Sequence, residues 1–366
     1  MANRILFILL VSIIIGLHGC GEVVTSSTTT TVASTTTTTT TTGSPTTTGS
    51  SPTTTTTIAA SSTTTSTTTT TAASGWTIAR SPSGHYLYDV DFSTASFGCT
   101  IGGDGSIETT ADGGTTWTAR HNGTSSERLR GVNIVNTNTL YAFGYLPAPV
   151  WSGGYKSTDS GTSWGALVDV PNSINETSFY SADIGYVVTN SGGIHKTTNG
   201  GDSWVQQTSG TVNDLHAICA NYGATLWAAG ANGAIVYSVN SGTTWASATA
   251  DGGYTGRFND ITFATTSNGW AVGENGMIQA TTNGVNWSIQ TSGVTYELNA
   301  VSFVADTGVG WAVGMAGVIL HTDNGGTSWE RQDNSFTSNL HGVAALDTTH
   351  AIAVGDNGII LKYQGN

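Results

Sequence analysis

The chain has 366 residues, of which 10 are Lys or Arg and 23 are Asp or Glu, giving a net charge of −13. This composition argues against a nucleic-acid partner, because proteins that bind phosphate backbones concentrate Lys and Arg on one face. The excess of acidic residues favours solubility and repels anionic membrane surfaces.

Residues 1–19 have the features of a secretory leader: Arg4 near the start, an apolar run at 5–15, and LHGC at 17–20. The apolar run is too short to span a bilayer comfortably. LHGC resembles the lipobox of bacterial lipoproteins, in which the cysteine is lipidated and becomes the mature N-terminus. The resemblance implies a lipid on Cys20 and a lipoprotein of the bacterial cell envelope, facing the periplasm or the exterior. The alternative is an ordinary signal peptide with an incidental cysteine.

Residues 20–74 follow the leader and consist largely of Thr and Ser. Such a segment cannot bury enough apolar surface to offset the entropy lost on ordering. We therefore predict a disordered stalk, of a composition that often carries O-glycans.

From residue 75 to residue 366 the chain repeats one unit seven times. Each unit opens with a short strand that has apolar residues at alternate positions, at 87–92, 129–134, 174–179, 215–220, 258–263, 298–303 and 340–345. A hairpin with a Gly-x-x-Gly type of turn follows, at 100–107, 187–194, 228–235, 271–278, 312–319 and 353–360. The second unit has the longer segment 142–155 in this place.

Six units then continue into a turn with the pattern Ser/Thr-x-Asp/Asn-x-Gly-x-x-Trp. The short polar side chains can bond nearby backbone N–H groups and the Trp can fold over the turn. The polar and closing residues are Asp112, Trp117, Asp159, Trp164, Asn199, Trp204, Asn240, Trp245, Trp287, Asn324 and Trp329. Counting back from Trp287, the fifth copy is imperfect, with Ala280 and Thr282 at the hydroxyl and Asp positions.

Units of four short strands, repeated every ~40–45 residues, are typical of a β-propeller. We predict an all-β, seven-bladed propeller at 75–366. The last unit lacks a closing Trp, and 75–81, which contains Trp76, looks like the missing fourth strand. The N-terminal strand would then close the ring and protect the sheet edges. Cys99 and Cys219 lie in predicted strands of separate blades, so we expect buried, unpaired thiols; a disulfide is the alternative.

The sequence contains no catalytic or metal-binding signature that we can assign. The histidines are scattered without metal-ligand spacing, and no nucleophile elbow, P-loop or dinucleotide fingerprint is present. We predict no metal and no cofactor. A glycosidase needs two carboxylates beside the scissile bond, and Asp89, Glu176 and Asp260 are the candidates because they share one position of the opening strand.

The repeated turns resemble the Asp-box, or BNR, motif of sialidases, xyloglucan-cleaving propellers and sortilin-type receptors. The resemblance implies that these turns lie on the outer rim and do no chemistry. The whole unit, best seen at 258–287 and 298–329, resembles a family of seven-bladed propellers that assist photosystem II assembly. That family implies a non-enzymatic protein that binds a partner polypeptide through an Arg-rich patch. The present chain departs from the family in having few basic residues and a long Thr-rich stalk.

In a propeller the opening strands line the central channel, and the loops that enter them crowd one face. We expect a partner to bind there through Tyr88, Arg128, Arg130, His216, Arg257 and His341, together with Tyr145 and Trp151 in the inserted segment of the second unit. The partner would be a protein or peptide, and the propeller a monomer. The alternative is a cell-surface propeller that binds or hydrolyses glycans.

Overall fold

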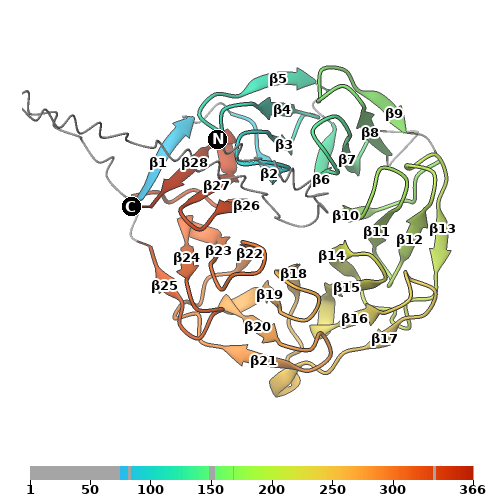
Figure 1. Ribbon diagram of the computed structural model, residues 1–366, viewed down its shortest axis with the longest axis vertical. Coiled ribbons are helices and arrows are strands. Elements are labelled where there is room, and N and C mark those ends of the chain that lie inside the picture. The colour runs from blue at the N-terminus through green and yellow to red at the C-terminus, as the bar shows by residue number, and fades with distance from the viewer. Residues whose placement is uncertain are drawn as a thin grey trace, which may run out of the picture. The chain divides into compact units, whose positions relative to one another are not determined.

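The computed structural model describes residues 75–80, 84–121, 123–124, 126–147, 153–167, 169–332 and 335–365. Within these ranges, 28 strands form seven four-stranded antiparallel sheets, the blades of a ring (Figure 1). The predicted all-β, seven-bladed propeller is confirmed. The predicted leader, Cys20 and the Thr-rich stalk lie outside the described residues.

Each blade is a meander whose first strand lines the channel and whose fourth strand lies on the outside (Figure 1). The first strands of blades 1 to 7 are β2 (Leu87–Phe92), β6 (Arg128–Ile134), β10 (Ile174–Phe179), β14 (Leu215–Tyr222), β18 (Phe258–Phe263), β22 (Leu298–Phe303) and β26 (Leu340–Asp347). The second strands are β3 (Gly98–Gly102), β7 (Leu140–Tyr145), β11 (Gly185–Thr189), β15 (Thr225–Gly230), β19 (Gly269–Gly273), β23 (Gly310–Gly314) and β27 (His350–Gly355).

The two outer positions of each blade are shorter on average. The third strands are β4 (Ile107–Thr110), β8 (Gly153–Ser157), β12 (Ile194–Thr197), β16 (Ile235–Ser238), β20 (Ile278–Thr281), β24 (Ile319–Thr322) and β28 (Ile360–Gln364). The fourth strands are β5 (Thr118–His121), β9 (Gly165–Leu167), β13 (Val205–Gln207), β17 (Ala246–Ser247), β21 (Trp287–Gln290), β25 (Glu330–Arg331) and β1 (Gly75–Arg80). The helical residues assigned in these ranges form 3₁₀ turns: η1 (Ala231–Gly233), η2 (Asp251–Gly253), η3 (Glu274–Gly276), η4 (Met315–Gly317) and η5 (Asp356–Gly358).

The ring is closed by β1, which supplies the fourth strand of blade 7, as predicted. Its residues pair antiparallel with β28, from Gly75 opposite Gln364 to Arg80 opposite Ile360. In Figure 1 the first strand of the chain therefore lies beside the last. Trp76 packs on Tyr363 with a ring-centroid distance of 5.4 Å, so it helps to bury the cluster between blades 6 and 7.

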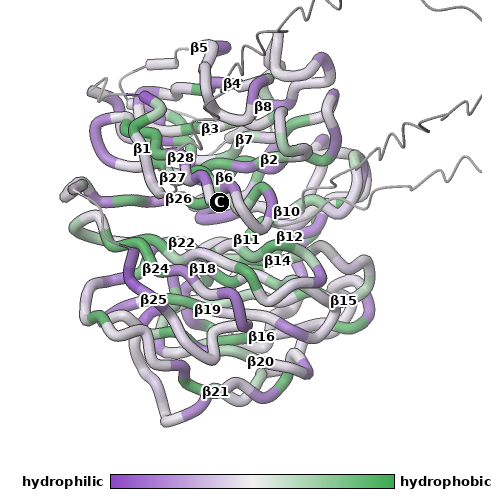
Figure 2. Tube along the Cα trace, turned by 60° about the vertical axis from the view of Figure 1, so that its left-hand side comes forward, coloured by the Kyte–Doolittle hydropathy of each residue, from purple (hydrophilic) through white to green (hydrophobic). Residues whose placement is uncertain are grey.

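The hydrophobic core is divided among the seven interfaces between neighbouring blades. Each cluster combines side chains of two adjacent sheets; the cluster between blades 5 and 6, for example, contains Trp270, Val272, Leu298 and Phe303. In Figure 2 many of the hydrophobic segments, coloured green, lie on the strands. Trp270 stacks on Phe303 at 3.5 Å, and Trp329 meets the edge of that Phe at 5.7 Å. Such aromatic pairs add ~0.5–1.5 kcal/mol beyond their burial.

The Asp-box turns connect the third and fourth strands, on the outer part of the blades. In the first turn, the hydroxyl of Thr110 accepts the N–H of Gly114 at 3.0 Å, and Asp112 accepts the N–H of Thr116 at 2.8 Å. Hydrogen bonds from Thr116 lower the pKa of Asp112 to about 2. The indole of Trp117 donates to Gly114 at 3.1 Å and covers the turn. These contacts make the turn a local structural clip.

The prediction for the fifth turn was wrong by one residue. Thr281 and Asn283, instead of Ala280 and Thr282, supply the hydroxyl and the Asx side chain. The Thr281 hydroxyl accepts the N–H of Gly284 at 2.9 Å across three residues, whereas four residues separate the equivalent pair in the first turn. Because this turn is one residue shorter, counting back from Trp287 misplaces its polar positions.

Both cysteines follow the prediction. Cys99 and Cys219 are fully buried in β3 and β14, in different blades, and neither forms a disulfide. Burial raises the pKa of the Cys99 thiol well above its ordinary value, so this thiol is unreactive.

Candidate functional site

The mouth of the channel is a cavity of about 690 Å³. It is lined by one equivalent residue of every first strand, the third residue in β6 and the second in the other six: Tyr88, Arg130, Asn175, His216, Asn259, Asn299 and His341. Each of these residues lies at an irregularity in the pairing of the first strand with the second, for example between Leu87 and Asp89 and between Leu340 and Gly342. Such a bulge redirects a side chain. Arg128, Arg257 and Tyr145 line the same cavity. The structure thus brings together seven of the eight residues predicted to contact a partner, and Trp151 lies outside the described residues.

Three of these seven residues hold neighbouring blades together. Asn175, Asn259 and Asn299 each donate their side-chain amide to the carbonyl of the first residue in the next blade's first strand, at 2.7–2.8 Å. In the other four blades Tyr88, Arg130, His216 or His341 occupies this position, and none makes the equivalent bond among the described residues. Blades 7, 1 and 2 are consecutive, so His341, Tyr88 and Arg130 form one arc that the blade-to-blade links leave available.

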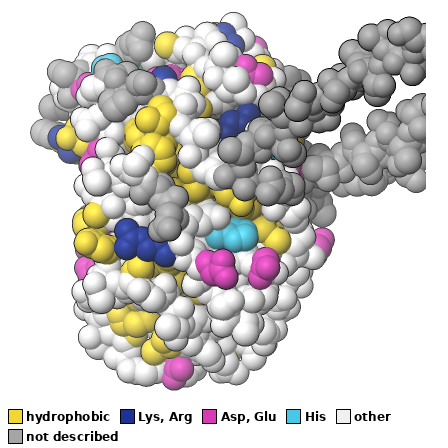
Figure 3. Space-filling model, turned by 90° about the vertical axis from the view of Figure 1, so that its left-hand side faces the viewer, with side chains coloured by type: hydrophobic (Ala, Val, Ile, Leu, Met, Phe, Trp, Pro, Cys, Tyr) yellow, Lys and Arg dark blue, Asp and Glu magenta, His cyan; other side chains and the backbone are white. Residues whose placement is uncertain are grey.

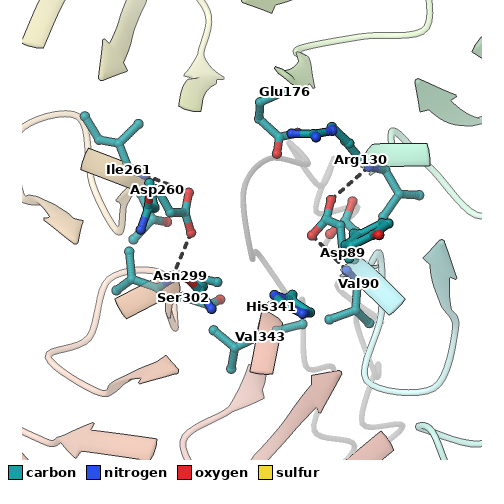
Figure 4. Close-up of a pocket in the computed structure, with 18 of the residues that line it drawn as sticks. Asp89, Val90, Arg130, Glu176, Asp260, Ile261, Asn299, Ser302, His341 and Val343 are labelled. Atoms are coloured by element: carbon teal, nitrogen blue, oxygen red, sulfur yellow. Dashed lines mark hydrogen bonds between the residues drawn. The ribbon is translucent and has the colours of Figure 1, made fainter. Parts of the chain in front are cut away.

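The buried carboxylates below the mouth also join blades. Asp89 accepts the N–H of Val90 and, from blade 2, the N–H of Val132, both at 2.8 Å. Asp260 accepts the N–H of Ile261 at 2.7 Å and, from blade 6, that of Val301 at 2.8 Å. In Figure 4 the two side chains lie on opposite sides of the channel. Burial raises the pKa of Asp89 to about 6 and that of Asp260 to about 7, although these amides favour the charged form.

Asp91 repeats this arrangement one layer deeper, accepting the N–H of Phe92 at 2.7 Å and that of Ile134 in blade 2 at 2.6 Å. Burial raises its pKa to about 7.

Since both oxygens of Asp89 and Asp260 are occupied by backbone amides, neither carboxylate is placed to act on a glycosidic bond without giving up a link between blades. Glu176, the third carboxylate at this position, accepts the N–H of its neighbour Thr177 at 2.7 Å.

The three mouth arginines differ in their surroundings. The guanidinium of Arg257 forms an ion pair with Glu297, lies 3.7 Å from Glu274 and donates to Asn259 at 2.7 Å. Arg128 and Arg130 are exposed on β6, and no carboxylate in the described ranges forms an ion pair with either of them. The charge of Arg257 is therefore compensated by ion pairs, whereas no ion pair of Arg128 or Arg130 is found among the described residues; in Figure 4 the side chain of Glu176 lies beside that of Arg130.

The two histidines of the mouth also have different environments. His341 lies 2.6 Å from Asp356 through Nε2, and its ring is 5.7 Å from that of Tyr88. His216 makes no ion pair within the described part of the chain; burial, with a contribution from Arg257, lowers its pKa below the ordinary histidine value.

Sequence reasoning missed Glu274 and Asp356, which partner Arg257 and His341. Both begin the 3₁₀ turn between the second and third strands, at η3 and η5. These turns open on the same face as the loops that enter the first strands. The residue after the last Gly of the second strand is thus a recurring mouth position that could have been found from the repeat.

Neither a metal centre nor a membrane-spanning helix is found in the part of the chain that the structure describes. No group of three or more His, Cys, Asp or Glu side chains there could hold a metal ion. None of its helices has the length and apolar character needed to cross a bilayer. On the face shown in Figure 3, acidic and basic side chains form small separate groups without a continuous patch of one sign.

Comparison with known proteins gives one family and many structures. The family described as "Photosynthesis system II assembly factor YCF48" matches residues 68–221 and 253–364. YCF48 from Cyanidioschyzon merolae is 22% identical, with a TM-score of 0.63 over 80% of this chain and 99% of that one. A structure of YCF48 bound to D1 peptide is 20% identical, with a TM-score of 0.65 over 80% and 95% of the two chains.

The same fold occurs in an enzyme. The GH74 enzyme of Niastella koreensis is 15% identical, with a TM-score of 0.62 over 78% of this chain and 53% of that one. At such identities these structures establish a shared fold alone. No curated protein matches the sequence.

Proposed function

Because the chain belongs to the family of photosynthesis system II assembly factor YCF48, we propose that it binds a segment of a partner polypeptide at the channel mouth and acts as a non-enzymatic assembly factor. The solved YCF48 complex holds a D1 peptide, which supports peptide binding as the use of this face. The ligand of the present chain is then an extended or loop segment that reaches the arc formed by blades 7, 1 and 2.

The observation that carries this proposal is the pair Arg128 and Arg130. Both are exposed, both line the mouth cavity, and neither forms an ion pair with a described carboxylate. A guanidinium binds a carboxylate with two parallel hydrogen bonds, and such charge-assisted bonds are among the strongest available at an interface. In a protein with a net charge of −13, the pair favours an acidic segment.

Replacing both Arg128 and Arg130 by alanine is expected to weaken partner binding about 100-fold, because two charge-assisted contacts contribute about 3 kcal/mol. The immobilised full-length protein would first capture its partner from solubilised membranes of the native organism, and the Kd would then be measured for the captured polypeptide.

Arg331→Ala, on the exposed outer strand β25, is the matched control and should leave the Kd unchanged. Equal affinities of the double variant and the Arg331 control would contradict the proposal. A parallel glycan array tests the alternative ligand: glycan binding without a protein partner would replace the assembly role by a lectin role.

We also propose that a lipid on Cys20 holds the protein to a membrane of the cell envelope and that residues 20–74 serve as the spacer. The support is the sequence LHGC after an apolar run. Replacing Cys20 by alanine should move the protein from the membrane fraction to the soluble fraction and abolish incorporation of labelled fatty acid. An unlabelled wild-type protein would overturn this part of the proposal without affecting the binding role.

A further inference from the structure

Next to the mouth lies a second cavity of about 480 Å³, here called the blade-1 groove. Tyr86, Asp104 and Glu127 line it, and it shares Tyr88, Arg128 and His341 with the mouth. A ligand held at the mouth can therefore continue into this groove. The features of the groove that bear on its ligand are its aromatic surface and the charge of its walls.

The aromatic surface consists of two tyrosines. The rings of Tyr86 and Tyr88 are nearly parallel, with an interplanar angle of 11° and a centroid distance of 6.4 Å. Tyr86 is 48% exposed although it adjoins a cavity. Parallel tyrosine faces at a cavity wall present a negative π surface, which attracts ammonium and guanidinium groups.

The walls of the blade-1 groove carry mainly negative charge, which favours binding of a cation. Asp104, Asp356 and Glu127 line the groove, against one arginine, Arg128, on the side that faces the mouth. Asp104 lies 3.1 Å from His85 and its side chain is 46% exposed. Asp356 is held by His341 at 2.6 Å and Asn339 at 2.9 Å. The mouth and the groove thus offer opposite charges on the two sides of Arg128.

We propose that the blade-1 groove binds a lysine or arginine side chain of the partner, close in sequence to the acidic residue held by Arg128 and Arg130. The ammonium or guanidinium group lies over Tyr86 and Tyr88, with the carboxylates of Asp104 and Asp356 beside it. This inference rests on the proposed peptide-binding function and specifies the partner motif: an acidic residue and a basic residue within a few positions of each other.

The test uses labelled synthetic Gly/Ser peptides that carry two aspartates and, one to four residues away on either side, either lysine or norleucine. Norleucine keeps the aliphatic stem and lacks the charge. Titration of the full-length protein, followed by fluorescence anisotropy, should show 5- to 10-fold tighter binding of the best lysine peptide over its norleucine counterpart.

Asp104→Asn and Tyr86→Ala should each reduce this preference to below threefold. Asp104 has φ of 57°, a conformation that asparagine adopts readily, so the first substitution removes charge without backbone strain. Asp306→Asn, at φ of 56° in a loop at the opposite ends of the strands, is its control. Tyr296→Ala, equally exposed at 48%, is the control for Tyr86.

Equal affinities of the lysine and norleucine peptides, or equal losses in the two control variants, would overturn the basic-residue assignment while leaving acidic-peptide binding intact. Failure of every aspartate peptide to bind, at any concentration up to the millimolar range, would instead contradict the proposed function and this inference with it. The two failures are therefore distinguishable.

Discussion

Deletion of residues 75–80 is expected to abolish cooperative folding of the propeller. β1 pairs with β28 through five residue pairs, and its loss exposes that strand as an open edge. It also removes Trp76, whose indole donates to Gln332 of the loop after blade 6, and Arg80, which forms an ion pair with Glu108 of blade 1. Burial of one large aromatic side chain is worth about 3–5 kcal/mol, a large part of a typical total of about 5–15 kcal/mol.

The deletion should therefore lower the unfolding midpoint by more than 10 °C or eliminate a single transition, as followed by circular dichroism, and should produce aggregates on size exclusion. Two point variants separate the contributions of a half-buried and an exposed residue of β1 to stability. Trp76→Ala should lower the free energy of unfolding by about 3 kcal/mol. Ile78→Ala, at a residue that is 49% exposed, should lower it by less than about 1 kcal/mol. A deletion variant that melts like the intact protein would show that the ring does not depend on this strand.

Replacing both Asp89 and Asp91 by alanine is expected to lower the free energy of unfolding by about 3–6 kcal/mol. The two carboxylates accept four backbone N–H groups, two of them from blade 2. Each buried donor left without a partner costs about 1–3 kcal/mol, and water in the channel offsets part of this loss. Asp202→Ala, at an exposed position of an Asp-box turn, is the control and should change the stability by less than about 0.5 kcal/mol.

The same variant should alter the dependence of stability on pH. Burial raises the pKa of Asp89 to about 6 and that of Asp91 to about 7, above the ordinary value of 3.8. The folded protein therefore binds protons more tightly at these groups than the unfolded chain does. Their contribution to stability falls as the pH rises from about 4 to about 7. In denaturant titrations, the free energy of unfolding of the wild type should therefore exceed that of the double variant by more at pH 5 than at pH 8. An equal difference at the two pH values would contradict these pKa shifts.

The fold could be predicted from the sequence because its determinants are local and repeated. The Trp of each Asp-box, the alternating first strands and the displaced Trp76 together define seven blades and their closure. The polar residues of the fifth turn were not predicted correctly, because this turn is one residue shorter than the others. Thr281 and Asn283 therefore lie one residue closer to Trp287 than the pattern predicts. Because the polar positions were assigned by counting back from the Trp, a turn that is one residue shorter was misassigned.

The candidate site was only partly predictable, since its side chains come from different blades. The repeat places Tyr88, Arg130 and His341 at equivalent positions of their blades, but no local pattern reveals that Glu274 and Glu297 form ion pairs with Arg257. The structural role of Asn175, Asn259 and Asn299 could have been predicted, because a residue that recurs at one position of several blades is more often part of the scaffold. The residues that break such a repetition are the better functional candidates.

The closure of the ring by β1 has a mechanical consequence. Gly75 and Gln364 are paired, so the chain enters and leaves the propeller at one hydrogen-bonded position. Tension applied through the residues before Gly75, while a partner holds the mouth, would reach this pair before any other part of the fold. The resistance of the whole domain to pulling would then be set by the few bonds of β1, and the other blades would bear load only after the ring had opened.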